Sequence, residues 1–393
     1  MNFGELKSAL FARSNFGVKL GLERMQEALR LLGDPHLAAP ALHVAGTNGK
    51  GSTCAFAEAS LRAAGLRTGL YTSPHLNHFC ERIRIGGATV SEERACELLE
   101  EVLRRVPWTL DDPGLTFFEI VTLMGFLAFR DVDVMVVEVG LGGRLDATNV
   151  LLRPAACAVT ALGIEHAEYL GPTLAQIAAE KAGIFKRGSP AVSVSQPPEA
   201  MEILQEKARP LGIALRISPP YQGKVSLAGE HQRANAGLAV ALLEASGLRH
   251  DAATGLATAV WPGRLEQFGN VYLDGAHNPH AAAALARSLP ELGRPLHLVF
   301  GALQDKDAAA MLRELAPHAA SVHYCAPDSP RAIAPQALAC SWPGTAHPTP
   351  AAALEAARSQ PGVVLACGSL YLVAELRALL LGEARAPMPS ERL

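Results

Sequence analysis

Short apolar runs rich in valine, isoleucine and alanine alternate along this chain with longer alanine- and leucine-rich segments of helical pattern. Strands of a parallel sheet that is buried on both faces have this composition, and a crossover helix must connect one parallel strand to the next. The alternation therefore predicts an α/β fold built from βαβ units. In the first part of the chain we expect strands at Leu42–Ala45, Val132–Val139, Ala156–Ala161 and Ala191–Ser195, and helices at Ser52–Ala64, Phe118–Phe129, Leu174–Phe185 and Ala234–Ala245.

The order of strand and helix starts afresh after Trp261-Pro262-Gly263-Arg264, a segment in which Pro-Gly breaks regular structure. A second series of alternating elements predicts a smaller doubly wound domain of its own. We therefore expect two domains, residues 1–261 and residues 262–393, with the hinge at this segment. The second domain is expected to contain strands at Val271–Leu273, Leu296–Gly301, Ser321–Cys325 and Val363–Ala366, and helices at Ala281–Leu289, Ala308–Leu315, Pro335–Ala339, Ala351–Arg358 and Tyr371–Leu381.

The composition favours a globular protein that binds small molecules. The chain has 393 residues, of which 49% are hydrophobic, and a formal net charge of −3, so it is long enough for two domains with cores. It has no dense block of lysine or arginine for nucleic acid or lipid headgroups, no segment as long as a membrane span, and no apolar leader at Met1–Asn15. We expect no nucleic-acid or membrane partner and a cytoplasmic location.

The cysteines point to the same compartment. They are odd in number, widely scattered and without a Cys-x-x-Cys pair, so they indicate neither a disulfide framework nor a zinc site and fit a reducing cytosol. The seven are Cys54, Cys80, Cys96, Cys157, Cys325, Cys340 and Cys367.

The sharpest local signal is the glycine-rich segment His43–Thr53, HVAGTNGKGST, which leads from an expected strand into an expected helix. Glycines let backbone N–H groups curl around phosphate oxygens at a helix N-terminus, and Lys50 supplies a point charge for the β and γ oxygens. The pattern departs from G-x-x-x-x-G-K-[ST] because position 44 is valine and Gly51 intervenes before the hydroxyl residues. This variant resembles the ATP loop of the Mur-ligase superfamily, whose members form amide bonds.

Glu138 closes the apolar strand that precedes the glycine-rich turn Gly140-Leu141-Gly142-Gly143. An acid at the carboxyl edge of a parallel sheet lies where ligands bind in such folds and can hold Mg²⁺ beside phosphates. A solvated glutamate at a strand end is the alternative for the residue alone, and the turn that follows favours the metal ligand.

Five other polar residues are weaker candidates. The apolar neighbours of Lys181 allow its ammonium either to reach past them to water or to be held deprotonated and modified, and the residues alone favour the first. His166, in the segment Gly163-Ile164-Glu165-His166, is either a loop histidine or a metal ligand. Asn235 and Asp274 could be helix or strand caps, and Arg264 a linker charge.

These motifs, in this order and over nearly the whole chain, resemble the folylpolyglutamate synthase/dihydrofolate synthase family. The resemblance implies a P-loop-containing, Mur-ligase-type ATPase domain plus a smaller Rossmann-like C-terminal domain, with the active site in the cleft between them. Further blocks that carry it are Leu20-Gly21-Leu22-Glu23-Arg24, Thr72-Ser73-Pro74-His75-Leu76, Glu81-Arg82-Ile83, Leu115-Thr116-Phe117-Phe118-Glu119, Asp305-Lys306-Asp307 and Gly368-Ser369-Leu370-Tyr371.

The resemblance also implies roles for single residues. The ATP ligands would be Asn48, Gly49, Lys50, Gly51, Ser52, Asn235, Arg264 and Asp274. One Mg²⁺ would be held by Ser73 and Glu138 and a second by His166, with Lys181 as a carbamylated lysine. The catalytic groups would be Lys50, Lys181, His166 and Arg264. The folate site would comprise Leu20, Gly21, Leu22, Phe118, Glu119, Leu145, Asp146 and Ala147, and the glutamate side His277 and Ser369. The chain departs from the family at Glu165, where an aspartate usually precedes the histidine.

The activity so implied is ATP-dependent ligation of L-glutamate to folyl-polyglutamates and to dihydropteroate, through an acyl phosphate, in folate biosynthesis. ATP, two Mg²⁺ ions and a monovalent cation such as K⁺ would be the cofactors of a monomer. A Mur-type peptidoglycan ligase is the nearest alternative, but it carries a UDP-binding domain before the ATP loop, and here only a short helical lead-in precedes Gly46. A nucleotide-dependent switch is the alternative of another class, and the chain lacks the Asn-Lys-x-Asp guanine signature.

Overall fold

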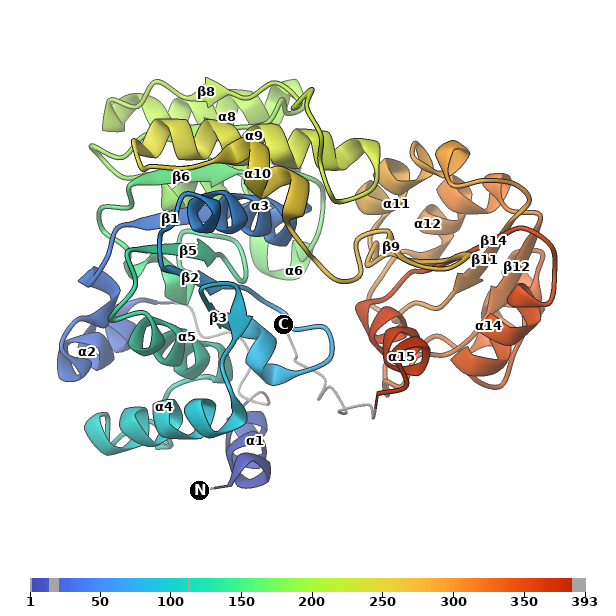
Figure 1. Ribbon diagram of the computed structural model, residues 1–393, viewed down its shortest axis with the longest axis horizontal. Coiled ribbons are helices and arrows are strands. Elements are labelled where there is room, and N and C mark those ends of the chain that lie inside the picture. The colour runs from blue at the N-terminus through green and yellow to red at the C-terminus, as the bar shows by residue number, and fades with distance from the viewer. Residues whose placement is uncertain (1, 14–20, 112–113, 384–393) are drawn as a thin grey trace.

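The computed structural model describes residues 2–13, 21–111 and 114–383, and its two lobes lie side by side, each around its own sheet (Figure 1). The sheet of the first lobe has the strand order β4-β3-β2-β5-β1-β6-β7-β8. Its strands are parallel except that β3 runs antiparallel to both β2 and β4. The strands are β1 Ala41–Ala45, β2 Thr68–Tyr71, β3 Ile83–Ile85, β4 Ala88–Thr89, β5 Val134–Glu138, β6 Ala156–Val159, β7 Ala191–Ser193 and β8 Arg216–Ile217.

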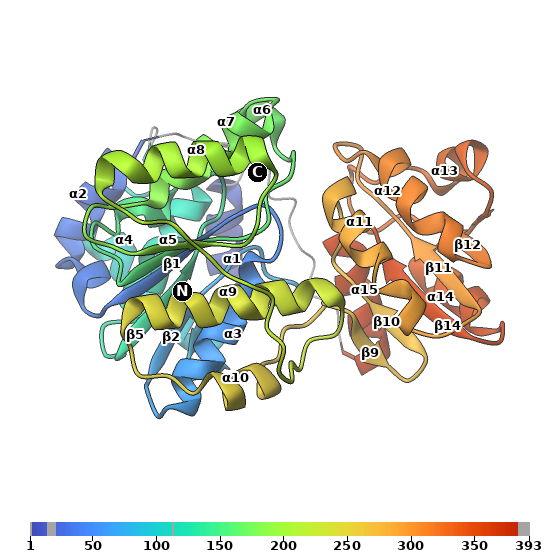
Figure 2. The same cartoon turned by 90° about the horizontal axis from the view of Figure 1, so that it is seen from above.

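Helices cover both faces of this sheet (Figure 2). Successive side chains of a strand point to opposite faces, so Leu42 and Val44 of β1 enter one core while Ala41 enters the other. The first face carries α3 Lys50–Ala63, α9 Glu230–Ser246 and α10 Ala252–Thr258. The opposite face carries α1 Phe3–Ala12, α2 Glu23–Leu32, α4 Glu92–Arg105, α5 Phe117–Ala128, α7 Leu174–Lys181 and α8 Pro198–Ala208, and the short α6 Ala167–Leu170 precedes α7.

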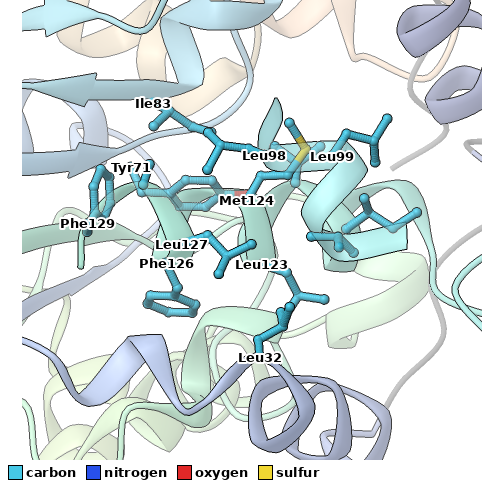
Figure 3. Packing of buried hydrophobic residues seen from close by; sticks show 14 of the residues in the cluster. Leu32, Tyr71, Ile83, Leu98, Leu99, Leu123, Met124, Phe126, Leu127 and Phe129 are labelled. Carbon is cyan, nitrogen blue, oxygen red and sulfur yellow. The ribbon is translucent and has the colours of Figure 1, made fainter. Parts of the chain in front are cut away.

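The core beneath α5 is apolar and buried. Leu123 and Met124 are fully buried, and they meet side chains from α2, α4 and the strands β2 and β3 (Figure 3). Their labelled neighbours are Leu32, Tyr71, Ile83, Leu98, Leu99, Phe126, Leu127 and Phe129.

Replacing Leu123 by alanine should lower the free energy of unfolding of the first lobe by about 2–5 kcal/mol, because the lost side chain leaves a cavity that rigid neighbours cannot fill. The matched control is Leu31→Ala on α2, whose leucine is 42% exposed and should cost no more than about 0.5 kcal/mol. Denaturant unfolding curves compare the two, and equal losses would contradict this packing.

The second lobe is a smaller α/β unit. Its sheet has the order β13-β12-β11-β14-β10-β9, and only the edge strand β9 is antiparallel to its neighbour. The strands are β9 Glu266–Phe268, β10 Val271–Leu273, β11 Leu296–Phe300, β12 Ser321–Tyr324, β13 Thr345–Ala346 and β14 Val363–Cys367. Helices α11 Pro279–Ala286, α12 Ala308–Leu315 and α13 Pro335–Ser341 pack on one face, and α14 Pro350–Arg358 and α15 Leu370–Leu381 on the other.

The expected α/β class is confirmed, and the expected elements are present, most of them with shifted ends, whereas β10 and α12 have the expected bounds. Helix α3 begins two residues earlier than expected because Gly49, at φ 92°, turns the chain directly into it. The expected helix Leu174–Phe185 ends at Lys181 and continues as a 3₁₀ turn, Ala182–Ile184. No helix of the described residues is long and apolar enough to cross a bilayer.

We propose residues 1–261 and 262–393 as the two domains, because the two sheets do not share strands and the last helix of the first lobe ends at Thr258.

The hinge is packed against the glycine-rich loop. A Cβ on Gly51 would lie 2.7 Å from Nε1 of Trp261, and the guanidinium carbon of Arg84 lies 4.8 Å from the centre of a Trp261 ring. Movement at the hinge would therefore shift the residues at the start of α3.

Candidate active site

The glycine-rich loop joins β1 to α3 at the carboxyl edge of the first sheet. Gly46 has a φ of 149°, and a Cβ there would lie 1.8 Å from Oγ1 of Thr160. Gly49 has a φ of 92°, and a Cβ there would lie 2.2 Å from Oδ1 of Asn235. Both positions therefore require glycine for conformation and for space.

Two lysines converge on the carbonyl groups of this loop. Nζ of Lys50 donates to the carbonyl oxygens of Gly46 and Thr47, both at 3.1 Å, and Nζ of Lys181 donates to that of Gly46 at 2.8 Å. Two lysine side chains beside one small loop at a helix N-terminus form an environment suited to an anion as highly charged as a triphosphate.

Hydroxyl groups beside the loop have no hydrogen-bond partner among the described residues. The oxygens of Ser52, Thr53 and Thr160 are fully buried and unpaired. A buried polar group without a partner costs free energy, so such atoms mark places where a ligand supplies the missing contact. Those of Ser52 and Thr53 stand in the first turn of α3, where phosphate oxygens or their metal ion would lie.

Glu138 is the last residue of β5 and is 4% exposed. Burial raises its pKa to about 7, against the opposing effect of the Lys50 charge and of a hydrogen bond from the backbone N–H of Ser73 at 3.2 Å. A carboxylate in this position is stabilised by a cation, which agrees with the expected metal ligand.

His166 and Lys181 both have a depressed pKa. Burial lowers the pKa of His166 to about 4, so its ring is neutral at physiological pH and keeps a lone pair for a metal. Burial, followed by the Lys50 charge, lowers the pKa of Lys181 to about 7. The expectation that the Lys181 ammonium reaches water is wrong. The side chain is 5% exposed and ends on the Gly46 carbonyl, because α7 packs it beneath the loop.

The carboxyl edges of both sheets face one cavity of about 510 Å³. Among the residues predicted from sequence, those on its wall are Asn48, Gly49, Lys50, Gly51, Ser52, Ser73, Glu138, His166, Asn235, Arg264, Asp274, His277 and Ser369. Lys181 lies just behind this wall, in contact with the loop. The ATP, metal and glutamate candidates are thus brought together from both lobes.

Some of these residues also hold the backbone in place. The carboxylate of Asp274 accepts from the N–H groups of Leu265 and Ala276, each at 2.9 Å, which ties the hinge to β10. The side chain of Ser369 caps α15 by accepting from the N–H of Tyr371 at 3.1 Å. Asp274 therefore caps backbone N–H groups, which was one interpretation of the sequence, and it also lines the cavity.

The residues predicted for folate binding do not line this cavity. Leu20 lies outside the described residues, and Gly21, Leu22, Phe118, Glu119, Leu145, Asp146 and Ala147 lie beyond its wall. Phe118 packs against the wall, since a Cβ on the wall residue Gly140 would lie 2.4 Å from its ring. Glu119 pairs with Arg24 at 2.9 Å and caps α5. Their roles in folate binding stay predictions.

Asp146 organises the loop that follows Glu138. Its carboxylate accepts from the N–H of Leu141 at 2.8 Å and from the N–H of Thr148 at 2.9 Å, and from the Thr148 hydroxyl. Burial raises its pKa despite these bonds. Loop order is a role that the sequence did not suggest for this residue.

Asp146→Ala should therefore raise the KM for dihydropteroate about tenfold or more, through loss of the bonds that shape the loop, while ATP affinity changes less than about twofold. Asp146→Asn keeps an acceptor oxygen, so its KM for dihydropteroate should lie between that of the wild type and that of Asp146→Ala. Separate measurements of nucleotide and dihydropteroate affinity check this, and an equal loss of both would contradict it.

The described residues contain no group of three or more His, Cys, Asp or Glu side chains that could hold a metal by themselves. Mg²⁺ usually takes one or two protein carboxylates and completes its shell with phosphates and water. Buried Glu138 and the unpaired Ser52 hydroxyl offer oxygen donors of this kind, and the neutral His166 ring offers a nitrogen.

Other polar residues of the cavity, among them Glu165, His280 and Lys306, were not assigned a role from sequence. Asn48, an expected ATP ligand, contacts Nδ1 of His280 at 2.9 Å, and its side-chain amide bonds that of Asn278 across the lobes at 3.0 and 3.1 Å. Lys306 and Glu165 form a second cross-lobe contact. Their positions just after β10, β11 and β6, where ligands bind in parallel sheets, were the available signal.

Comparison with known proteins places these features in a family. The model of the Mur ligase middle domain matches residues 44–211, and that of the Mur ligase glutamate ligase domain matches residues 263–370. The dihydrofolate synthase/folylpolyglutamate synthase of Bacillus subtilis is 35% identical over 437 residues, which cover 96% of this chain and 99% of that protein. A probable bifunctional folylpolyglutamate synthase/dihydropteroate synthase of Halobacterium salinarum is 37% identical over 421 residues, and this chain spans about half of its length, 51%.

Solved structures of folylpolyglutamate synthases are also similar to this chain over almost its full length. FolC of E. coli in complex with DHPP and ADP superposes with a TM-score of 0.89 at 31% identity, over 97% of this chain and 98% of that one. A bifunctional folylpolyglutamate synthase/dihydrofolate synthase of Yersinia pestis, complexed with AMPPNP and a Mn ion, has a TM-score of 0.84 at 32% identity, over 93% and 94% of the two chains. With the cavity, the loop and these matches agreeing, the chain belongs to the folylpolyglutamate synthase/dihydrofolate synthase family.

Proposed function

We propose that this protein is an ATP-dependent amide ligase that adds L-glutamate to folyl-polyglutamates, and that it also adds glutamate to dihydropteroate. The observation that carries the proposal is the single cavity in which the glycine-rich loop and Glu138 of one lobe face Arg264, His277 and Ser369 of the other. A switch protein would not need the second lobe. The match to the folate enzymes along almost the full chain speaks against the peptidoglycan ligase.

The chemistry follows from the inertness of a carboxylate toward amines in water. One oxygen of the folate carboxylate attacks the γ-phosphorus of ATP in line, and ADP leaves. Lys50 and Arg264 neutralise the charge that spreads over the phosphoryl oxygens. The neutral amino group of glutamate then attacks the carbonyl carbon of the acyl phosphate, and the tetrahedral intermediate expels phosphate and leaves the amide. Closure of the lobes excludes water, which would otherwise hydrolyse the acyl phosphate.

ATP and a divalent metal ion are the cofactors that the donor set supports. Bound at Ser73 and Glu138, Mg²⁺ would supply charge neutralisation at the phosphate oxygens. A second Mg²⁺ site at His166 completed by a carbamate on Lys181, a monovalent cation such as K⁺, the monomeric state and the cytoplasmic location stay predictions.

A product assay tests the proposed function. Incubation with ATP, Mg²⁺, glutamate and either dihydropteroate or tetrahydrofolate, followed by mass spectrometry, should give a glutamyl adduct of each acceptor. An adduct of tetrahydrofolate alone would restrict the enzyme to chain extension. ATP hydrolysis that is independent of glutamate and of both acceptors would contradict the ligase assignment.

A further inference from the structure

Glu165 spans the cleft between the lobes. Its Oε1 atom lies 3.1 Å from Nε2 of His277 and 3.3 Å from Nζ of Lys306. Glu165 belongs to the loop after β6, whereas His277 and Lys306 follow β10 and β11 of the second lobe. The side chains of Glu165 and Lys306 are only 10% and 15% exposed, so solvent screens this contact less than an ion pair on the surface.

The hydrogen-bond partners of His277 orient its ring. Its Nδ1 atom lies 2.8 Å from the carbonyl oxygen of Gly275, while Nε2 lies against the Glu165 carboxylate. A carbonyl oxygen can only accept, so Nδ1 is the donor in that contact. Glu165 therefore meets two nitrogen groups from the opposite lobe, the His277 ring and the Lys306 ammonium.

These two groups are in the right place to bind a substrate carboxylate. Both line the 510 Å³ cavity, as does Ser369. Two cations of the wall donate to backbone oxygens, Lys50 to that of Gly46 and Arg264 to that of Gly263. His277 and Lys306 instead contact a side-chain carboxylate, which another carboxylate can replace.

We propose that Glu165 is an intramolecular stand-in for a carboxylate of the glutamate substrate, which occupies His277 and Lys306 until the incoming amino acid displaces it. The inference rests on the proposed function, since it takes glutamate as the substrate. The Glu165 side chain ends in the same γ-carboxylate as free glutamate, so both suit the same pair of donors. An internal competitor lowers the apparent affinity by the fraction of molecules in which it holds the site. Glu165 is thus a positioning residue that sets the KM for glutamate.

Glu165→Gln tests the proposal, because it removes the charge and keeps the shape. Kinetics at saturating ATP and folate acceptor should show a KM for glutamate about three- to tenfold lower than in the wild type. The KM for ATP and the Mg²⁺ dependence should change less than about twofold, although His166 is the next residue.

Asp305→Asn is the matched control. Asp305 also lies near Lys306, with Oδ2 3.7 Å from Nζ, but it belongs to the same lobe and is 44% exposed. Removing its charge should change the KM for glutamate less than about twofold.

Lys306→Gln supplies the second half of a double-mutant cycle. It should raise the KM for glutamate about tenfold or more, through loss of a charged donor. Adding Glu165→Gln to Lys306→Gln should then change the KM for glutamate less than about twofold, since the ammonium for which Glu165 and the substrate compete is absent.

The proposal is overturned if Glu165→Gln leaves the KM for glutamate unchanged or raises it, if Asp305→Asn lowers it equally, or if the Mg²⁺ requirement moves instead. Calorimetric titration of glutamate into each protein with AMPPNP, Mg²⁺ and the folate acceptor gives the same comparison without turnover. Absence of any glutamate binding would also overturn the proposal. Failure of the proposed function differs, because the wild type would then form no glutamyl product at any glutamate concentration.

Discussion

Lys50→Ala is expected to lower kcat about 100- to 1,000-fold while the protein stays folded. Its ammonium contacts only two loop carbonyl oxygens among the described residues, so little of the fold depends on it. In turnover it faces phosphoryl oxygens whose charge is redistributed in the transition state, where a fixed cation contributes most.

Lys207→Ala is the matched control, because Lys207 is exposed on α8 and absent from the cavity wall. It should keep the kcat of the wild type. Steady-state kinetics and thermal unfolding of both variants check this. Activity of Lys50→Ala within a few-fold of the wild type, or loss of its folded structure, would contradict the role given to the loop.

Lys181→Ala is expected to cost about 100-fold or more in kcat and to recover part of it when short-chain carboxylic acids are added. The neutral amine reacts with CO₂, and burial has already lowered the pKa of Lys181 to about 7. The carbamate so formed keeps one N–H for the Gly46 carbonyl and offers hard oxygen ligands for a second Mg²⁺ near His166. An added carboxylate can replace those oxygens.

Lys181→Arg should not recover, because a guanidinium keeps its charge and fills the space. The direct readout is a ¹³C carbamate resonance after exchange with ¹³C-labelled bicarbonate, present in the wild type and absent from Lys181→Ala. An unmodified ammonium in a high-resolution map of the Mg²⁺–ATP complex, or normal activity of the alanine variant, would refute the modification.

Much of the fold could be predicted from local patterns. The runs at β1, β5 and β6 are mostly apolar, and the helices after them are long enough to show their period. Two strands of the first sheet were missed because their sequences are short or mixed. Thr68–Tyr71 forms the inner strand β2, in which Gly69 lies against the ring of Phe129. Arg216–Ile217 forms the exposed two-residue edge strand β8, so neither segment carries a strand pattern.

The candidate site, like the fold, could be predicted only in part. Lys50 and Glu138 could be located because a loop or a strand end fixes where they point. Lys181 was misjudged from its neighbours alone, since the Gly46 carbonyl that receives it is 135 positions away in the chain. Glu165 was noticed only as an unusual residue, because its partners His277 and Lys306 belong to the other lobe. Contacts between lobes leave no periodic trace in a sequence.

Transfer of oxygen from the folate acceptor to phosphate tests most directly whether this enzyme activates a carboxylate for amide formation. The acceptor carboxylate is labelled with ¹⁸O and incubated with ATP, Mg²⁺ and glutamate, and the released phosphate is examined by mass spectrometry. The account predicts one ¹⁸O atom in phosphate for each amide formed, because the oxygen that attacks the γ-phosphorus leaves with it. Phosphate without the label, released while the amide forms, would contradict the acyl phosphate and the function built on it.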